Sequence, residues 1–118
     1  MKVAVLSAAT GALEYRLLDN KLNELIETSQ YFLFYILCGY VTGKKSKEKS
    51  LGELWAEKNG APILYISEKT TEELISRVIL EADYIIFILN GNPLINNAFM
   101  KYKMLGKHGS VIKTNGTR

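Results

Sequence analysis

Short apolar runs alternate with amphipathic segments along almost the whole chain, and this alternation limits the fold more than any other feature. Most of the runs are apolar at successive residues, which is typical of strands covered on both faces. Strands separated by helices at this spacing favour right-handed βαβ units. We therefore expect an α/β fold, with a parallel sheet of about five strands between two layers of helices. The expected strands are Val3–Leu6, Phe32–Leu37, Ile63–Ile66, Tyr84–Leu89 and Ser110–Lys113.

The segments between these runs follow the helical period. One helix is expected from about Leu13 to Ser29, and another from Leu94 to Leu105, ending at Gly106. Ser50 with Glu53, and Thr70 with Glu73, match capping boxes, so two more helices should begin there, and Gly60 should end the first of them. The apolar residues expected to face the sheet are Leu17, Leu18, Leu22, Leu25, Ile26, Leu51, Leu54, Trp55, Leu74, Ile75, Val78, Ile79 and Ala82.

The length and composition indicate one ordinary globular domain. A chain of 118 residues can bury one hydrophobic core but not two, so we expect a single domain over residues 1–113 and a loose tail over residues 114–118. Its one cysteine, Cys38, cannot form an internal disulfide. No apolar run approaches the roughly 18 residues of a membrane span. We expect a cytoplasmic protein, in the host cytoplasm if a phage encodes it, without membrane contact.

A basic segment follows the second apolar run. Gly39 and Gly43 bracket its beginning, lysines follow, and Ser50 opens the next helix, so residues 38–49 are expected to form a loop. Free backbone amides, a helix N-terminus and lysine charges together favour anion binding. The alternative is a solvated lysine-rich insertion. Residues 43–46 resemble the end of a Walker A motif, but the preceding glycine lies one residue too near, and we reject a nucleotide hydrolase.

Two further segments should meet this loop at the carboxyl edge of the sheet, where open α/β sheets bind ligands. Small residues follow the first run, and asparagines, whose amides both donate and accept hydrogen bonds, follow the fourth. Tight turns need the same residue types whether or not a ligand binds. The residues expected to bind a ligand are Ser7, Ala8, Thr10, Gly11, Gly39, Tyr40, Thr42, Gly43, Lys44, Lys45, Ser46, Asn90, Gly91, Asn92 and Asn96.

Other chemistry finds less support in the sequence. His108 is the only histidine and has no second ligand nearby, so we expect neither a metal site nor a catalytic triad. We assign no catalytic residue and no cofactor. The net charge of +3 is too small to indicate nucleic acid by itself.

Several blocks of the chain resemble the SLOG superfamily, in its small bacterial and phage members. Residues 39–43 stand at that family's glycine-rich second turn, and residues 51–63, beginning Leu-Gly-Glu-Leu-Trp-Ala, resemble the helix and strand that follow it. Residues 82–87 resemble its Ala-Asp-hydrophobic strand entry, and residues 105–107 its closing Gly-Lys. The resemblance covers most of the chain and is most specific over residues 51–63.

This resemblance implies a Rossmann-like domain that binds nucleotides or nucleotide-derived signals. The superfamily includes signal-sensing domains of defence systems and phosphoribohydrolases that cleave N-glycosidic bonds, and its members often form dimers or larger oligomers. Where the family pattern has arginines, this chain has Ala9 and Thr42, and residues 94–98 replace the motif that carries the catalytic carboxylate. The resemblance therefore implies binding, for sensing or sequestration, without cleavage.

Three functional interpretations follow, in descending order. The first is a non-catalytic binder of a phosphorylated nucleotide or nucleotide-derived signal. The second is a small enzyme that cleaves a nucleoside or nucleotide N-glycosidic bond. The third is a single-stranded nucleic-acid binding module in which Tyr40 stacks on a base. A homo-oligomer is also expected, through helix faces carrying Trp55, or Phe99 and Tyr102, unless these aromatics belong to the core.

The lysines of residues 44–49 are expected to replace the missing arginine charge. Changing Lys44, Lys45 and Lys47 together to Ala should weaken nucleotide binding and reduce its dependence on salt, because fewer screened charge interactions remain. Calorimetric titration at two salt concentrations measures both effects. An unchanged affinity would contradict the expectation.

Overall fold

A five-stranded sheet forms the middle of the molecule in the computed structural model, which describes residues 1–7, 12–28, 35–42, 50–89, 93–106 and 108–113. The strand order is β3-β2-β1-β4-β5, and every neighbouring pair is parallel. The sequence prediction of a parallel α/β sheet is thus confirmed. The elements are β1 (Lys2–Ser7), α1 (Ala12–Thr28), β2 (Tyr35–Val41), α2 (Leu51–Asn59), β3 (Ile63–Glu68), α3 (Thr71–Glu81), β4 (Tyr84–Leu89), α4 (Pro93–Leu105) and β5 (Gly109–Lys113).

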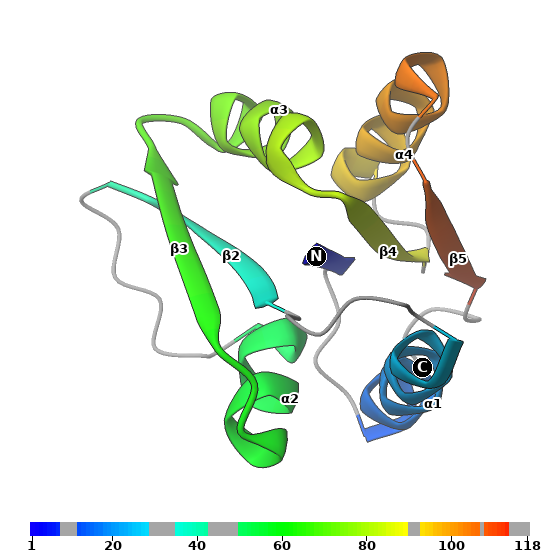
Figure 1. The fold of residues 1–118 in the computed structure, drawn as a ribbon. Helices are drawn as coiled ribbons and strands as arrows, with labels where there is room; N and C mark the ends of the chain where they lie inside the picture. Colours follow the sequence, from blue (N-terminus) through cyan, green and yellow to red (C-terminus); the bar gives the residue numbers. More distant parts are fainter. Residues whose placement is uncertain (8–11, 29–34, 43–49, 90–92, 107, 114–118) are drawn as a thin grey trace.

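Helices cover both faces of the sheet. Figure 1 shows α1 and α2 together on one side, and α3 and α4 together on the other. Two groups of buried side chains fill the spaces between the layers, one around Trp55 beneath α1 and α2, and one around Phe87 beneath α3 and α4. The Cα radius of gyration is 13.3 Å, close to the ~13.5 Å expected of one compact domain of this length. The structure is therefore a single Rossmann-like α/β domain.

Each core has one large aromatic side chain that fixes its packing. The Trp55 ring is almost fully buried, and its Nε1–H donates a hydrogen bond to Asp19 Oδ1 at 2.8 Å, so its polar group is satisfied. Phe87 is fully buried, and its ring centroid lies 5.4 Å from that of Phe99 and 5.0 Å from that of Tyr102. These contacts join α2 to α1 and α4 to β4.

The second strand differs most from its predicted bounds. It was expected to end at Leu37, before a loop beginning at Cys38, but β2 continues to Val41. Gly39 and Tyr40 pair with Ile66 and Ser67 of β3 instead of turning away. The loop prediction is therefore wrong over residues 38–41, while the expected strand residues 32–34 and loop residues 43–49 lie outside the described part of the chain.

Helix ends follow the sequence closely. Ser50 Oγ accepts a hydrogen bond from the Glu53 amide at 3.2 Å, and Thr70 Oγ1 accepts one from the Glu73 amide at 3.2 Å, so both predicted N-caps are confirmed. The prediction of burial against the sheet is wrong for two residues, since Ile26 is 44% exposed and Leu54 is 39% exposed. Each of the two lies at the side of the apolar stripe of its helix, and other residues at the centre of that stripe are the ones that are buried.

Over the described residues, none of the helices has the length and apolar character needed to cross a membrane. Residues 114–118, expected to form a tail, lie outside the described residues.

Gly60 provides a test of how α2 ends. Its φ is 69°, and a Cβ added there would have no heavy atom within 4 Å, so a substitution is penalised by backbone conformation and not by a clash. Gly60→Ala should lower the free energy of unfolding by about 1 kcal/mol, and Gly60→Asn by less, because Asn tolerates the left-handed region. Urea unfolding followed by circular dichroism measures both values. An Asn variant no more stable than the Ala variant would contradict this account.

Candidate functional site

The carboxyl edge of the sheet contains the point where the strand order reverses. The adjacent strands β1 and β4 end together there, with Ser7 in register with Ile88. The chain leaves β1 for α1 on one face, and leaves β4 for α4 on the other (Figure 1). In open α/β sheets, a point where consecutive connections go to opposite faces is the usual place for a ligand.

Five of the predicted ligand-binding residues lie in the described part of the chain. Ser7 ends β1, Gly39 and Tyr40 lie in β2, Thr42 follows β2 directly, and Asn96 lies in the first turn of α4. All of them are in the carboxyl half of the sheet or in a helix that begins at that edge. The remaining ten, which lie outside the described residues, are Ala8, Thr10, Gly11, Gly43, Lys44, Lys45, Ser46, Asn90, Gly91 and Asn92.

Gly39 has a packing reason to be glycine. A Cβ there would lie 2.6 Å from Leu74 Cδ1, so the missing side chain allows α3 to approach β2 closely. Tyr40 alternates to the opposite face, towards α2, and is 52% exposed. These two neighbours therefore do not converge on one ligand from the same face.

Thr42 is held by the end of β3. Its amide donates to the Glu68 carbonyl at 2.9 Å, and its hydroxyl donates to the same oxygen at 3.3 Å. These bonds fix the backbone directly before the lysine-rich residues 43–49. The contribution of Thr42 that the structure describes is to hold the chain at the sheet edge.

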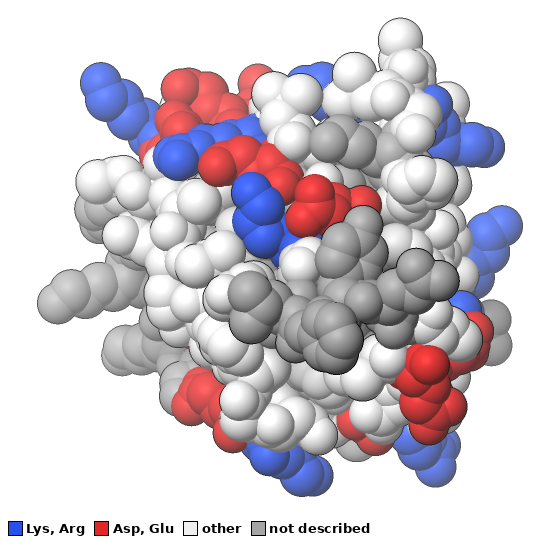
Figure 2. All heavy atoms as spheres, in the orientation of Figure 1, with Lys and Arg blue, Asp and Glu red and all other residues white. Residues whose placement is uncertain are grey.

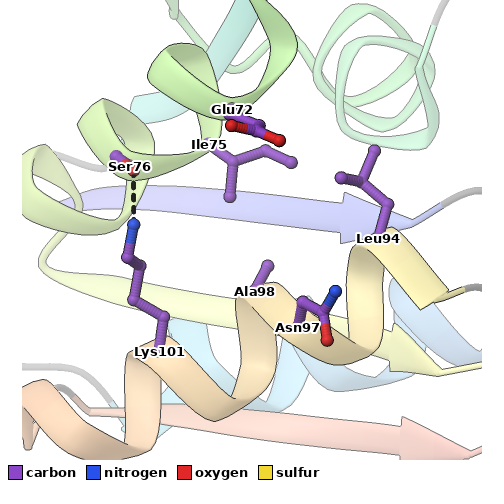
Figure 3. Close-up of a pocket in the computed structure, with 7 residues that line it drawn as sticks. All are labelled: Glu72, Ile75, Ser76, Leu94, Asn97, Ala98 and Lys101. Atoms are coloured by element: carbon purple, nitrogen blue, oxygen red, sulfur yellow. Dashed lines mark hydrogen bonds between the residues drawn. The ribbon is translucent and has the colours of Figure 1, made fainter.

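A groove of about 220 Å³ lies between α3 and α4. Since α3 contacts β1 and α4 contacts β4, the groove lies over the seam between these two central strands. Figure 3 shows Leu94 at the end nearest the strand arrowheads, and Lys101 Nζ donating a 2.7 Å hydrogen bond to Ser76 Oγ towards the other end. The lining residues are Glu72, Ile75, Ser76, Leu94, Asn97, Ala98 and Lys101.

Sequence reasoning did not select this groove. Asn96 was chosen, but Asn96 is exposed elsewhere on α4 and it is the next residue, Asn97, that lines the groove. Neither Glu72 nor Lys101 was predicted to belong to a site. The available signal was the helical period: Leu94, Asn97, Ala98 and Lys101 recur at intervals of three and four and so share one face of α4.

A second group of polar side chains lies beneath the start of α2. Tyr65 is in register with Cys38 in the neighbouring strand, and its hydroxyl donates to Glu53 Oε2 at 3.3 Å, while Ser50 donates to Glu53 Oε1 at 3.5 Å. Burial raises the pKa of the Cys38 thiol to about 12; the Glu53 carboxylate also raises it, and the Ser50 hydroxyl lowers it. The thiol is therefore protonated at neutral pH, as expected of an apolar core residue and not of a nucleophile.

Charged side chains at the outer edge of β3 are paired with each other. Arg77 donates to Glu81 Oε2 at 2.6 Å and to Glu68 Oε2 at 3.0 Å, and also to the Ser67 carbonyl at 3.1 Å. On the face shown in Figure 2, described acidic and basic side chains lie interspersed and do not gather into a patch of one sign. Among the described residues, this face therefore shows no basic stripe of the kind typical of nucleic-acid binding.

The aromatic residues considered for self-association belong mainly to the core. Trp55 is 1% exposed, so its side chain belongs to the core, which was the alternative to an interface role. Phe99 and Tyr102 are partly buried against Phe87. The homo-oligomer and the cytoplasmic location stay predictions of the sequence.

A scan against protein-family models gives no match, and a search of curated proteins gives no significant match. The resemblance to the SLOG superfamily stays a hypothesis that rests on the residues quoted for it.

Cys38 provides a chemical test of the buried environment in the middle of β2. Raising a thiol pKa from 9.0 to about 12 reduces the thiolate fraction roughly 1,000-fold near neutral pH. Iodoacetamide at pH 8 should therefore label the folded chain at least about 100 times more slowly than the urea-unfolded chain. Glu53→Gln should speed labelling of the folded chain without affecting the unfolded one. Equal rates in the folded and unfolded chains would contradict the assignment.

Proposed function

We propose that the protein binds a phosphorylated nucleotide, or a signal derived from one, at the carboxyl edge of the sheet and does not cleave it. The observation that carries this proposal is the reversal of strand order between β1 and β4, with a groove between α3 and α4 directly over the same seam. Crevices at such reversals receive ligands because two connecting segments diverge around them.

The residues at this edge suit an anionic ligand. The N-termini of the described helices lie there, since each helix follows the carboxyl end of a strand, and helix N-termini carry partial positive charge. The first turns of α1, α2 and α3 contain acidic residues, whereas that of α4 contains none, so the N-terminus of α4 suits an anion best. The lysine-rich residues 43–49 connect β2 to α2 at the same edge. Free phosphate groups would gain from both the backbone dipoles and the lysine charges. The resemblance to the SLOG superfamily favours the same class of ligand.

Binding without cleavage is favoured by the engagement of two carboxylates near this edge, those of Glu53 and Glu68. Glu68 forms an ion pair with Arg77, and Glu53 accepts hydrogen bonds from Tyr65 and Ser50. Hydrolysis of a glycosidic bond normally requires a carboxylate beside the anomeric carbon to stabilise positive charge. Both of these carboxylates already have partners within the protein.

The proposal is tested by the small molecules that accompany the purified protein. We expect denaturation to release an unmodified nucleotide or nucleotide derivative, identified by mass spectrometry, and the stripped protein to bind the same compound in a calorimetric titration. Release of free base on incubation with a nucleotide panel would show an enzyme and contradict the non-catalytic assignment. Failure to bind any phosphorylated nucleotide would overturn the proposal.

A further inference from the structure

The groove between α3 and α4 has polar groups around an apolar base. Ile75 and Ala98 form its floor, and Leu94 forms the wall nearest the strand ends (Figure 3). Its volume of about 220 Å³ is below the roughly 300 Å³ at which pockets for whole small-molecule ligands begin. It therefore suits a flat, largely apolar part of a ligand, such as a heterocyclic base, and not a complete nucleotide.

Two opposite charges line the groove and decide which part of a nucleotide it suits. Glu72 is acidic and Lys101 is basic, so the groove has no net charge and gives a phosphate no electrostatic advantage over an uncharged base. The phosphate end would then lie outside the groove, beyond Leu94 at the carboxyl edge of the sheet. The base end, which is uncharged, would occupy the groove.

The hydrogen-bonding groups of the groove favour one kind of base. The Glu72 carboxylate only accepts, the Lys101 ammonium only donates, and the Asn97 amide does both. Glu72 projects from α3, while Asn97 and Lys101 project from α4 across the groove (Figure 3). Guanine has adjacent donors at N1–H and the N2 amino group, and acceptors at O6 and N7. Adenine lacks that pair of adjacent donors.

We propose that the α3–α4 groove selects guanine, with Glu72 accepting from N1–H and the N2 amino group, and Asn97 or Lys101 donating to O6 or N7. The inference rests on the proposed function and adds the identity of the base. Lys101 gives up or shares its 2.7 Å hydrogen bond to Ser76 when it contacts the base. Ile75 and Leu94 pack against the ring.

The test compares GMP, IMP and AMP in calorimetric titrations of the intact chain. IMP has N1–H and O6 but lacks the N2 amino group, so GMP should bind more tightly than IMP, and IMP more tightly than AMP. GMP should exceed AMP by at least about ten-fold in affinity, the effect of a hydrogen bond to a charged group. This comparison needs no variant and so does not depend on a substitution that disturbs folding.

A pair of variants tests whether Glu72 is responsible for the selection of guanine. Glu72→Gln should reduce GMP affinity by at least about ten-fold and leave AMP affinity within about two-fold. Glu27→Gln, the same charge change at an exposed residue near the end of α1, should leave both unchanged. Equal binding of GMP and AMP, or equal effects of the two variants, would overturn guanine selection while the nucleotide-binding proposal stands. Binding of none of the three, together with no binding of any other nucleotide, would overturn both.

Discussion

The parallel pairing of β1 with β4 is the interaction on which the rest of the structure depends. Val3 to Ser7 pair in register with Tyr84 to Ile88, although the two strands are separated by most of the chain. Both strands have buried side chains on both faces, so the pair belongs to both cores at once. Parallel strands cannot be joined by a tight turn, and the helices that make their connections must therefore cover the two faces.

The same pairing is the basis of the ligand site proposed at one edge of the sheet. At the carboxyl ends of β1 and β4 the chain departs to opposite faces, and α3 and α4 stand side by side over the seam. The two ends of a nucleotide would meet different surroundings there. Helix N-termini and lysines suit its phosphates, whereas the small groove with Glu72 suits an uncharged base with adjacent donors.

Much of the fold could be predicted from local signals. The run Tyr84–Leu89 is apolar throughout and is a strand with those bounds, and the caps at Ser50 and Thr70 depend only on residues within one helical turn. Gly39 was misinterpreted because a glycine that begins a loop and a glycine that allows a helix to approach look alike in sequence. The second case depends on Leu74, which lies far along the chain and becomes its neighbour only through folding.

The candidate site was less accessible to sequence reasoning for the same physical reason. Glycines and lysines mark loops, and they directed attention to the segments that follow β1, β2 and β4. The groove arises from two helix faces brought together by the sheet, and Glu72 and Asn97 line it from two helices that β4 separates in the sequence. Neither residue stands out in its own segment. Within its own helix each is an ordinary surface residue, and it becomes part of a groove only when the other helix packs beside it.

The most direct test of the account is to find which residues change their backbone amide shifts when a nucleotide binds. Backbone amide shifts of a ¹⁵N-labelled chain, followed during titration with GMP, report this for each residue. The account predicts that the affected residues gather at the carboxyl edge and the groove, with Ser7, Leu94 and Asn97 among them. Shifts confined to the opposite edge, around Lys2, Asp83 and His108, or no shifts with any phosphorylated nucleotide, would contradict it.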